Sequence, residues 1–415
     1  MSVMIDTAPL RHPAFRRIWI GQGVSAIGFQ LTAVVVPVQV YALTKSSLWV
    51  GTLGLANLIP LIFFGLWGGA IADHVDRRRL LLTASVISWC ATLMLMAQAL
   101  IHLDSVWVIM AVVIVQSSGF AISSPTRGAI IPRILEPAEV PAANTLNFTF
   151  SQVSILLGPL LAGVLLIVTD QDYALMYGMD ALLFSAGLWA AFRLPPIPPL
   201  TVSTTRPGLR SVLEGFAFLA TQPVLMMSFV VDIIAMAIAM PRALFPELAT
   251  TRFGDPSAVG WLVAGIGLGG VVAGLLSGWV GKVRRQGLAL ILAVMFWGLA
   301  VAAAGLMHNL WAAVFLLGLG GCADLVSGVF RQTILQTYAP DEMRGRLQGV
   351  FIVVVAGGPR LGDLRAGAVA AATTASFSWV SGGIACAVLV LVAAALSPSL
   401  LNYRVSRNVG TEDDL

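Results

Sequence analysis

Four ionisable residues stand inside long apolar stretches of the sequence, where charged residues are rare. Asp232 and Asp324 each lie about midway along one stretch, and Arg360 and Asp363 share another. If these stretches cross a membrane, each ionisable group costs several kcal/mol there, and such groups usually mark a substrate path or a proton relay. We therefore expect all four to be candidates for proton coupling, with an aspartate that takes up a proton on one side and releases it on the other.

The same residues also have a purely structural interpretation. An ion pair between Asp324 and Arg360 would hold two helices together without exchanging any proton. Asp180 lies nearer the end of its apolar stretch, and we interpret it as structural.

A glycine, acidic residues and three arginines follow the second apolar stretch, in the run from Gly69 to Arg79. Glycine lets two helices approach closely, and Asp73 can lie against the positive N-terminal end of a neighbouring helix. We expect Gly69, Asp73, Arg77 and Arg78 to form a latch that holds one conformation. The alternative is a solvated loop that only sets the membrane topology.

Glycine and proline also interrupt the fifth apolar stretch, at Gly158, Pro159 and Gly163. Together they weaken a helix and thin its surface, so the helix can bend and slide against a partner. We expect this segment to lie at a moving interface, and the alternative is a kinked helix that only packs.

Amide side chains are scattered through other apolar stretches, among them Gln30, Gln116 and Asn147, with methionines and aromatic residues nearby. Mixed amides, thioethers and aromatic rings suit a broad amphipathic ligand. Amides also serve ordinary packing between membrane helices, so this pattern alone leaves both interpretations open.

The elements that must position these residues follow from composition. Of 415 residues, 58% are hydrophobic and only 11% are charged, whereas about a quarter of residues are charged in soluble domains. Spanning a bilayer takes roughly 20 apolar residues, and runs of that length predict twelve transmembrane helices. We place them at 17–42, 48–72, 80–101, 105–126, 142–168, 173–193, 222–249, 257–281, 287–307, 310–337, 345–372 and 377–398.

Basic residues set the orientation, because cytoplasmic loops retain positive charge. With the N-terminus inside, nineteen of the 24 lysines and arginines fall on the cytoplasmic side. Both termini are therefore expected in the cytoplasm. The net charge of +4 is spread over short loops, which excludes a nucleic-acid surface.

A proline-rich segment divides the chain near its middle. It predicts an N-terminal six-helix bundle at 1–193, a cytoplasmic linker at 194–210 and a C-terminal bundle at 211–415, which begins with an amphipathic helix near 209–221. The halves also match at fixed offsets, which indicates duplication. Pro13 corresponds to Pro223, a shift of 210, and Arg127-Gly-Ala-Ile-Ile corresponds to Arg331-Gln-Thr-Ile-Leu, a shift of 204.

The chain resembles the enterobactin exporter group of the major facilitator superfamily, close to drug and proton antiporters. The resemblance rests on the run from Gly69 to Arg79, on the glycines and proline of the fifth stretch, and on further short motifs: His12-Pro-Ala-Phe-Arg16, Val36-Pro-Val-Gln-Val40, Leu244-Phe-Pro-Glu-Leu248 and Ile334-Leu-Gln-Thr-Tyr-Ala-Pro340. His74 departs from the family pattern, which usually has arginine there. The resemblance implies an all-α integral membrane protein of two pseudo-symmetric bundles, in which Asp232 and Asp324 face a central cavity.

We therefore expect a monomeric exporter of small amphipathic molecules by proton antiport, in a bacterial inner membrane. A dedicated siderophore or metabolite exporter is one alternative, and a non-transporting sensor or scaffold with the same fold is another. The three cysteines and four histidines form no metal-ligand pattern, so we expect no metal, no cofactor and no enzymatic activity.

Overall fold

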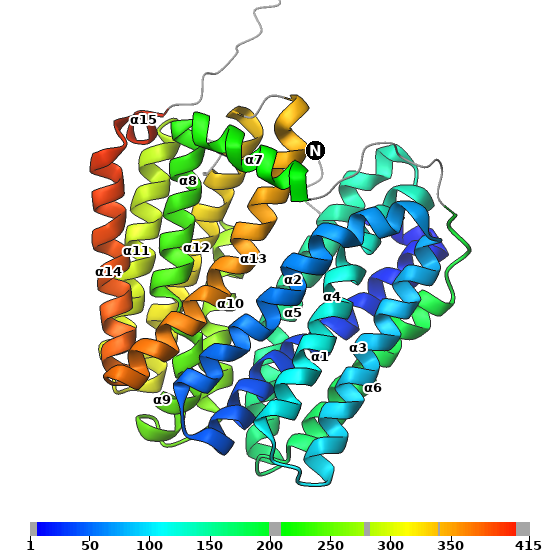
Figure 1. Ribbon diagram of the computed structural model, residues 1–415, viewed down its shortest axis with the longest axis horizontal. Coiled ribbons are helices and arrows are strands. Elements are labelled where there is room, and N and C mark those ends of the chain that lie inside the picture. Colours follow the sequence, from blue (N-terminus) through cyan, green and yellow to red (C-terminus); the bar gives the residue numbers. More distant parts are fainter. Residues whose placement is uncertain (1–5, 199–208, 278–282, 339–340, 404–415) are drawn as a thin grey trace, which may run out of the picture.

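The computed structural model describes residues 6–198, 209–277, 283–338 and 341–403 (Figure 1), and within them every regular element is a helix. Side chains at 65–74 and at several positions in α7, α12 and α13 lie outside this description. The N-terminal half consists of α1 (Pro13–Thr44), α2 (Ser47–His74), α3 (Arg77–Leu100), α4 (Val106–Ile134), α5 (Val140–Val168) and α6 (Tyr173–Phe192), with 3-10 turns at Ala8–Arg11 and Pro137–Glu139.

A second group of helices forms the C-terminal half. It consists of α8 (Pro223–Ile233), α9 (Phe245–Thr251), α10 (Ala258–Leu275), α11 (Gln286–Leu306), α12 (Leu310–Tyr338), α13 (Asp341–Ala372), α14 (Ala375–Leu396) and the short α15 (Pro398–Leu401). The amphipathic segment is α7 (Leu209–Thr221), over the residues that the sequence predicts. The predicted all-α membrane fold is confirmed, and each of the twelve predicted spans has a helical counterpart.

The seventh predicted span, at 222–249, is not one continuous helix, and this expectation is corrected. Helix α8 ends at Ile233 and continues as a π-helical segment, η3 (Ile234–Ile238), before the 3-10 turn η4 (Arg242–Leu244) and α9. Pro241 and Pro246 lack the backbone N–H that an uninterrupted helix would use. The break comes directly after Asp232, and π segments often occur at functional sites.

Within the described residues, eleven helical spans are long and apolar enough to cross a membrane. Helix α13 is not among them, because Arg360, Asp363 and Arg365 make it more polar. Helix α13 packs along α2 of the other half, so its charged residues are not surrounded by lipid only.

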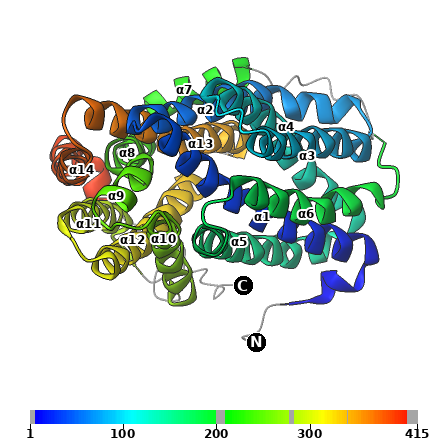
Figure 2. The ribbon, with the colours of Figure 1, turned by 90° about the horizontal axis from the view of Figure 1, so that it is seen from below.

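The two halves lean together at the end that carries α9 and diverge toward the end that carries α7 (Figure 1). Two helix pairs make most of the contact, α2 with α13 and α5 with α10, and each pair lies side by side in the view from below (Figure 2). Glycines bring the backbones together there. A Cβ on Gly51 would lie 2.5 Å from the carbonyl oxygen of Asp363, and one on Gly54 would lie 2.5 Å from that of Arg360. Side chains cannot be inserted at these positions without separating the helices.

Candidate functional site

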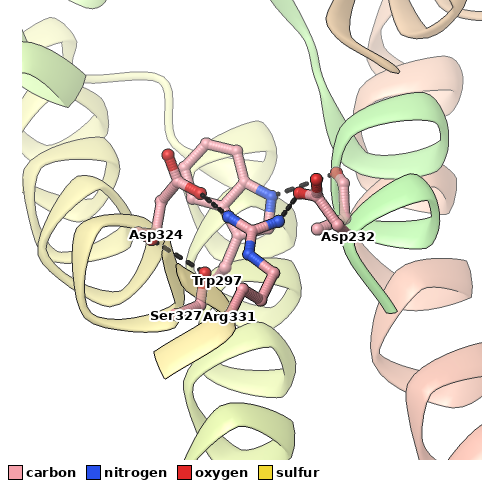
Figure 3. Close-up of polar contacts among 6 residues, drawn as sticks. Asp232, Trp297, Asp324, Ser327 and Arg331 are labelled. Atoms are coloured by element: carbon pink, nitrogen blue, oxygen red, sulfur yellow. Dashed lines mark hydrogen bonds and ion pairs between the residues drawn. The ribbon is translucent and has the colours of Figure 1, made fainter. Parts of the chain in front are cut away.

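A buried charged cluster lies inside the C-terminal half (Figure 3). The guanidinium of Arg331 is in direct ion-pair contact with the carboxylate of Asp232, and its Nη2 lies 3.9 Å from Oδ1 of Asp324. The side chains of Asp232 and Arg331 are 3% and 8% exposed, whereas that of Asp324 is 34% exposed. One cation thus stands between two acids, and only one of the acids is accessible.

The helices explain this geometry. Asp324 and Arg331 are seven residues apart on α12, which is two helical turns, so they share a face. Asp232 enters from the last turn of α8, just before the π segment. Trp297 of α11 donates its indole N–H to the carbonyl oxygen of Ala235 at 3.2 Å and packs beside the cluster (Figure 3).

The structure corrects the expected partner of Asp324. The cation beside it is Arg331 and not Arg360, so the predicted ion pair between α12 and α13 does not form here. Arg331 was not among the predicted coupling residues. Its spacing of seven from Asp324 was the signal that could have identified it.

Arg360 and Asp363 instead line a separate pocket of about 220 Å³ between the two halves. Gln30 and Gln116 line the same pocket, and Arg242 of η4 joins them. Arg242 was not among the candidate residues predicted from the sequence. The four predicted coupling residues therefore divide into two sites, Asp232 and Asp324 in one and Arg360 and Asp363 in the other.

Asn147 lines a third region, a larger pocket of about 420 Å³ inside the N-terminal half. Helices α1, α3, α4, α5 and α6 form its walls. Its polar residues include Gln22, Ser151 and Arg127, beside the aromatic side chains of Trp19 and Phe120.

The glycine and proline residues of α5 lie against two different partners. A Cβ on Gly260 of α10 would lie 2.5 Å from the carbonyl oxygen of Pro159 and 2.7 Å from Cα of Gly163, so these two residues face the other half. Gly158 faces α1 within its own half, where a Cβ would lie 2.3 Å from that of Gln30.

The predicted latch is described only in part. Gly69 and Asp73 lie outside the described side chains. Arg77 donates to the carbonyl oxygen of Ala129 at 3.0 Å, and Arg78 donates to that of Phe192 at 2.7 Å. Both arginines therefore bind backbone carbonyl groups of the N-terminal half.

Asp76 has a role that the sequence reasoning did not assign. Its carboxylate accepts hydrogen bonds from the backbone N–H groups of Arg79 and Ile197, both at 3.0 Å. The first bond caps α3, because an N-cap carboxylate satisfies free N–H groups at a helix start. The second attaches the chain after α6 to the same helix end.

Asp180 is fully buried in the N-terminal half, in agreement with its structural interpretation. It accepts a 2.6 Å hydrogen bond from Thr32 and a 3.4 Å bond from Thr92, and thereby joins α1, α3 and α6. Replacing Asp180 by alanine leaves both hydroxyls without this acceptor, and we expect a loss of about 1–3 kcal/mol in the free energy of unfolding. Unfolding in sodium dodecyl sulfate measures it. Asp180→Asn keeps an acceptor and should lose less, and an alanine variant as stable as the wild type would contradict the assignment.

Comparisons with known proteins agree with this architecture. Among solved structures, the chain is similar to a nucleoside transporter (TM-score 0.76, 13% identity, 92% of this chain and 99% of that one). It is also similar to a D-xylose-proton symporter (TM-score 0.72, 14% identity, 95% and 100%). These similarities concern the fold alone, which is that of an all-α integral membrane protein.

Residues 5–409 match the family described as transmembrane secretion effectors, and the chain belongs to this family. It is 28% identical over 405 residues to the enterobactin exporter EntS of Citrobacter koseri, covering 95% of this chain and 94% of that protein. It is 29% identical over 375 residues to the enterobactin exporter EntS of Shigella boydii, covering 88% and 86%.

Proposed function

We propose that this protein exports small amphipathic molecules in exchange for protons. The observation that carries the proposal is the cluster of two acids around one buried cation, Asp232, Asp324 and Arg331. A buried charge is costly unless it is paired. Asp232 alone can neutralise Arg331, so Asp324 is free to gain and lose a proton without leaving the cation unpaired.

Accessibility assigns the two acids different roles. Asp324 is partly exposed, and we infer that water reaches it and exchanges its proton, whereas Asp232 is closed off by its contact with Arg331. When Asp324 is ionised, it competes with Asp232 for the guanidinium. The π segment η3 follows Asp232 closely in the chain. The competition can therefore link the protonation of Asp324 to the conformation of α8 and η3.

Alternation between the two sides of the membrane uses the contacts between the halves. The close backbone contacts of α2 with α13 and of α5 with α10 hold the halves together at the α9 end. If the halves separated at these contacts and closed at the α7 end, the space between them would open to the opposite side of the membrane. Transporters built from two related bundles work in this way. The protein would work as a monomer in a bacterial inner membrane, with both termini in the cytoplasm.

A dedicated siderophore exporter is the second candidate, favoured by the similarity to two enterobactin exporters. A substrate panel in cells that lack other efflux pumps separates the two candidates. Broad export of unrelated drugs supports the first, and export of siderophores alone supports the second. A sensor or scaffold would export neither.

The proton exchange itself is tested by Asp324→Asn in proteoliposomes with a substrate from that panel. Because Arg331 keeps Asp232, we expect the variant to fold and to exchange labelled substrate across the membrane. We expect substrate-driven proton flux, followed with an internal pH dye, to fall at least about tenfold. This fall corresponds to an increase of about 1.4 kcal/mol in the activation free energy of the proton-coupled step.

Asp104→Asn is the matched control, because Asp104 is exposed and has a positive φ of 46°, which asparagine tolerates. Its proton flux should equal that of the wild type. Undiminished flux in Asp324→Asn across a pH series would show that Asp324 does not couple to protons.

A further inference from the structure

Arg127 is a cation without an acidic partner among the residues that the structure describes in the N-terminal half. Its Nη1 lies 3.3 Å from the hydroxyl of Ser123, and its guanidinium lies 5.8 Å from the centre of the Phe120 ring. Among the described residues, no carboxylate lies within ion-pair distance of it. Arg127 is half-buried, and the approach of an opposite charge would offset the partial loss of its hydration.

The surrounding pocket of about 420 Å³ has features of a ligand site. Gln22, Asn147 and Ser151 line it, and none of their side chains has a hydrogen bond within the described part of the chain. Phe120 is stacked on Phe29 with ring centroids 4.9 Å apart. A cation, free amide groups and stacked rings together suit a planar ligand that carries an anionic group.

The match between the two halves of the sequence lets the surroundings of Arg127 be compared with those of Arg331. Pro13 is the first residue of α1 and Pro223 the first of α8, so Gln22 and Asp232 are each the tenth residue of equivalent helices. By the shift of 204, Arg127 corresponds to Arg331. The C-terminal half therefore places a carboxylate where the N-terminal half has the amide of Gln22.

The same shift extends to the neighbours on the helix. Ser123 corresponds to Ser327, four residues before each arginine, and Phe120 corresponds to Asp324, seven residues before it. The two carboxylates that surround Arg331 are thus replaced by an amide and a phenyl ring around Arg127. The N-terminal half keeps the cation and the hydroxyl but lacks both acids.

We propose that this pocket binds a small aromatic anion, whose charged group contacts Arg127 in the place that Asp232 takes at Arg331. A carboxylate can accept two parallel N–H bonds from a guanidinium, and its ring can lie along the Phe29 and Phe120 pair. The free amides of Gln22 and Asn147 can bind further polar groups. The inference rests on the proposed function in that the anion is the transported substrate.

Binding tests the site without any need for transport. The probe is 1-hydroxy-2-naphthoate, compared with its uncharged amide, titrated by calorimetry into the full chain in nanodiscs of phosphatidylcholine. We expect the wild type to bind the naphthoate at least tenfold more tightly than the amide. Arg127→Gln should remove this preference.

Gln22→Glu is the sharper variant, because it keeps Arg127 and supplies the carboxylate that Asp232 supplies in the other half. It should lower the affinity for the naphthoate at least tenfold and leave that for the amide nearly unchanged. Arg17→Gln removes an exposed charge of the same helix and should keep the wild-type preference.

Equal binding of the two probes by the wild type would overturn the site, and so would a preference for the naphthoate that survives in Gln22→Glu and Arg127→Gln. Melting curves of each variant show whether it is folded. The proposed proton exchange fails separately, since it is judged on Asp324→Asn by proton flux and not by binding.

Discussion

Asp232→Ala is expected to abolish transport and to lower the free energy of unfolding by about 3 kcal/mol, because it leaves Arg331 buried without its contacting acid. Asp324 lies 3.9 Å away and is partly exposed, so its carboxylate compensates only part of the lost buried contact. Unfolding in sodium dodecyl sulfate measures the stability, and export of a substrate from the panel measures the activity.

The double variant Asp232→Ala with Arg331→Met shows whether the cause is the unpaired charge. Removing both members of a buried ion pair is often neutral for stability, so we expect the double variant to recover most of the loss. Transport should stay absent, because no cation remains for Asp324 to contact. A single variant as stable as the wild type would show that the pair does not hold α8 against α12.

Gly260→Leu is the second change with a large expected effect. Because the nearest atoms to an added Cβ belong to the backbone of Pro159 and Gly163, no rotamer can relieve the clash. We expect α5 and α10 to separate at the α9 end and transport to fall at least about tenfold, since one conformation of the cycle is lost.

Spin labels on Leu175 and Trp311, both exposed, would report the separation as a longer distance between the halves. Gly274→Leu is the control on the same helix, because the nearest atom to its added Cβ is a side-chain methyl of Leu325 at 3.9 Å. Unchanged distances and full transport in Gly260→Leu would show that this contact is not part of the cycle.

The helices could be predicted from sequence because lipid imposes one simple rule, a run of about twenty apolar residues. The amphipathic α7 followed from the same kind of pattern, with polar and apolar residues on opposite faces. The break after Asp232 could not be placed, since the apolar residues around Pro241 read like any membrane span. It depends on backbone hydrogen bonding that no hydropathy pattern records.

The acidic residues of the site could be predicted from the sequence, but the cation that pairs with them could not. Asp232 and Asp324 were identified because carboxylates are rare in apolar stretches, and they do share one cluster. Arg331 was not identified as a site residue, although its side chain contacts Asp232 inside the bundle. Which cation meets which acid depends on the packing of α8 against α12, which the sequence of either helix alone does not determine.

The glycine contacts between the halves have a mechanical consequence. At Gly51, Gly54 and Gly260, the backbone of one half lies directly against the backbone of the other. Parting such contacts needs no change of rotamer at the glycines, and rejoining them needs no search for the correct fit. We therefore expect these backbone contacts to separate and re-form readily during the transport cycle. The residues that select the substrate lie elsewhere and can vary without altering these contacts.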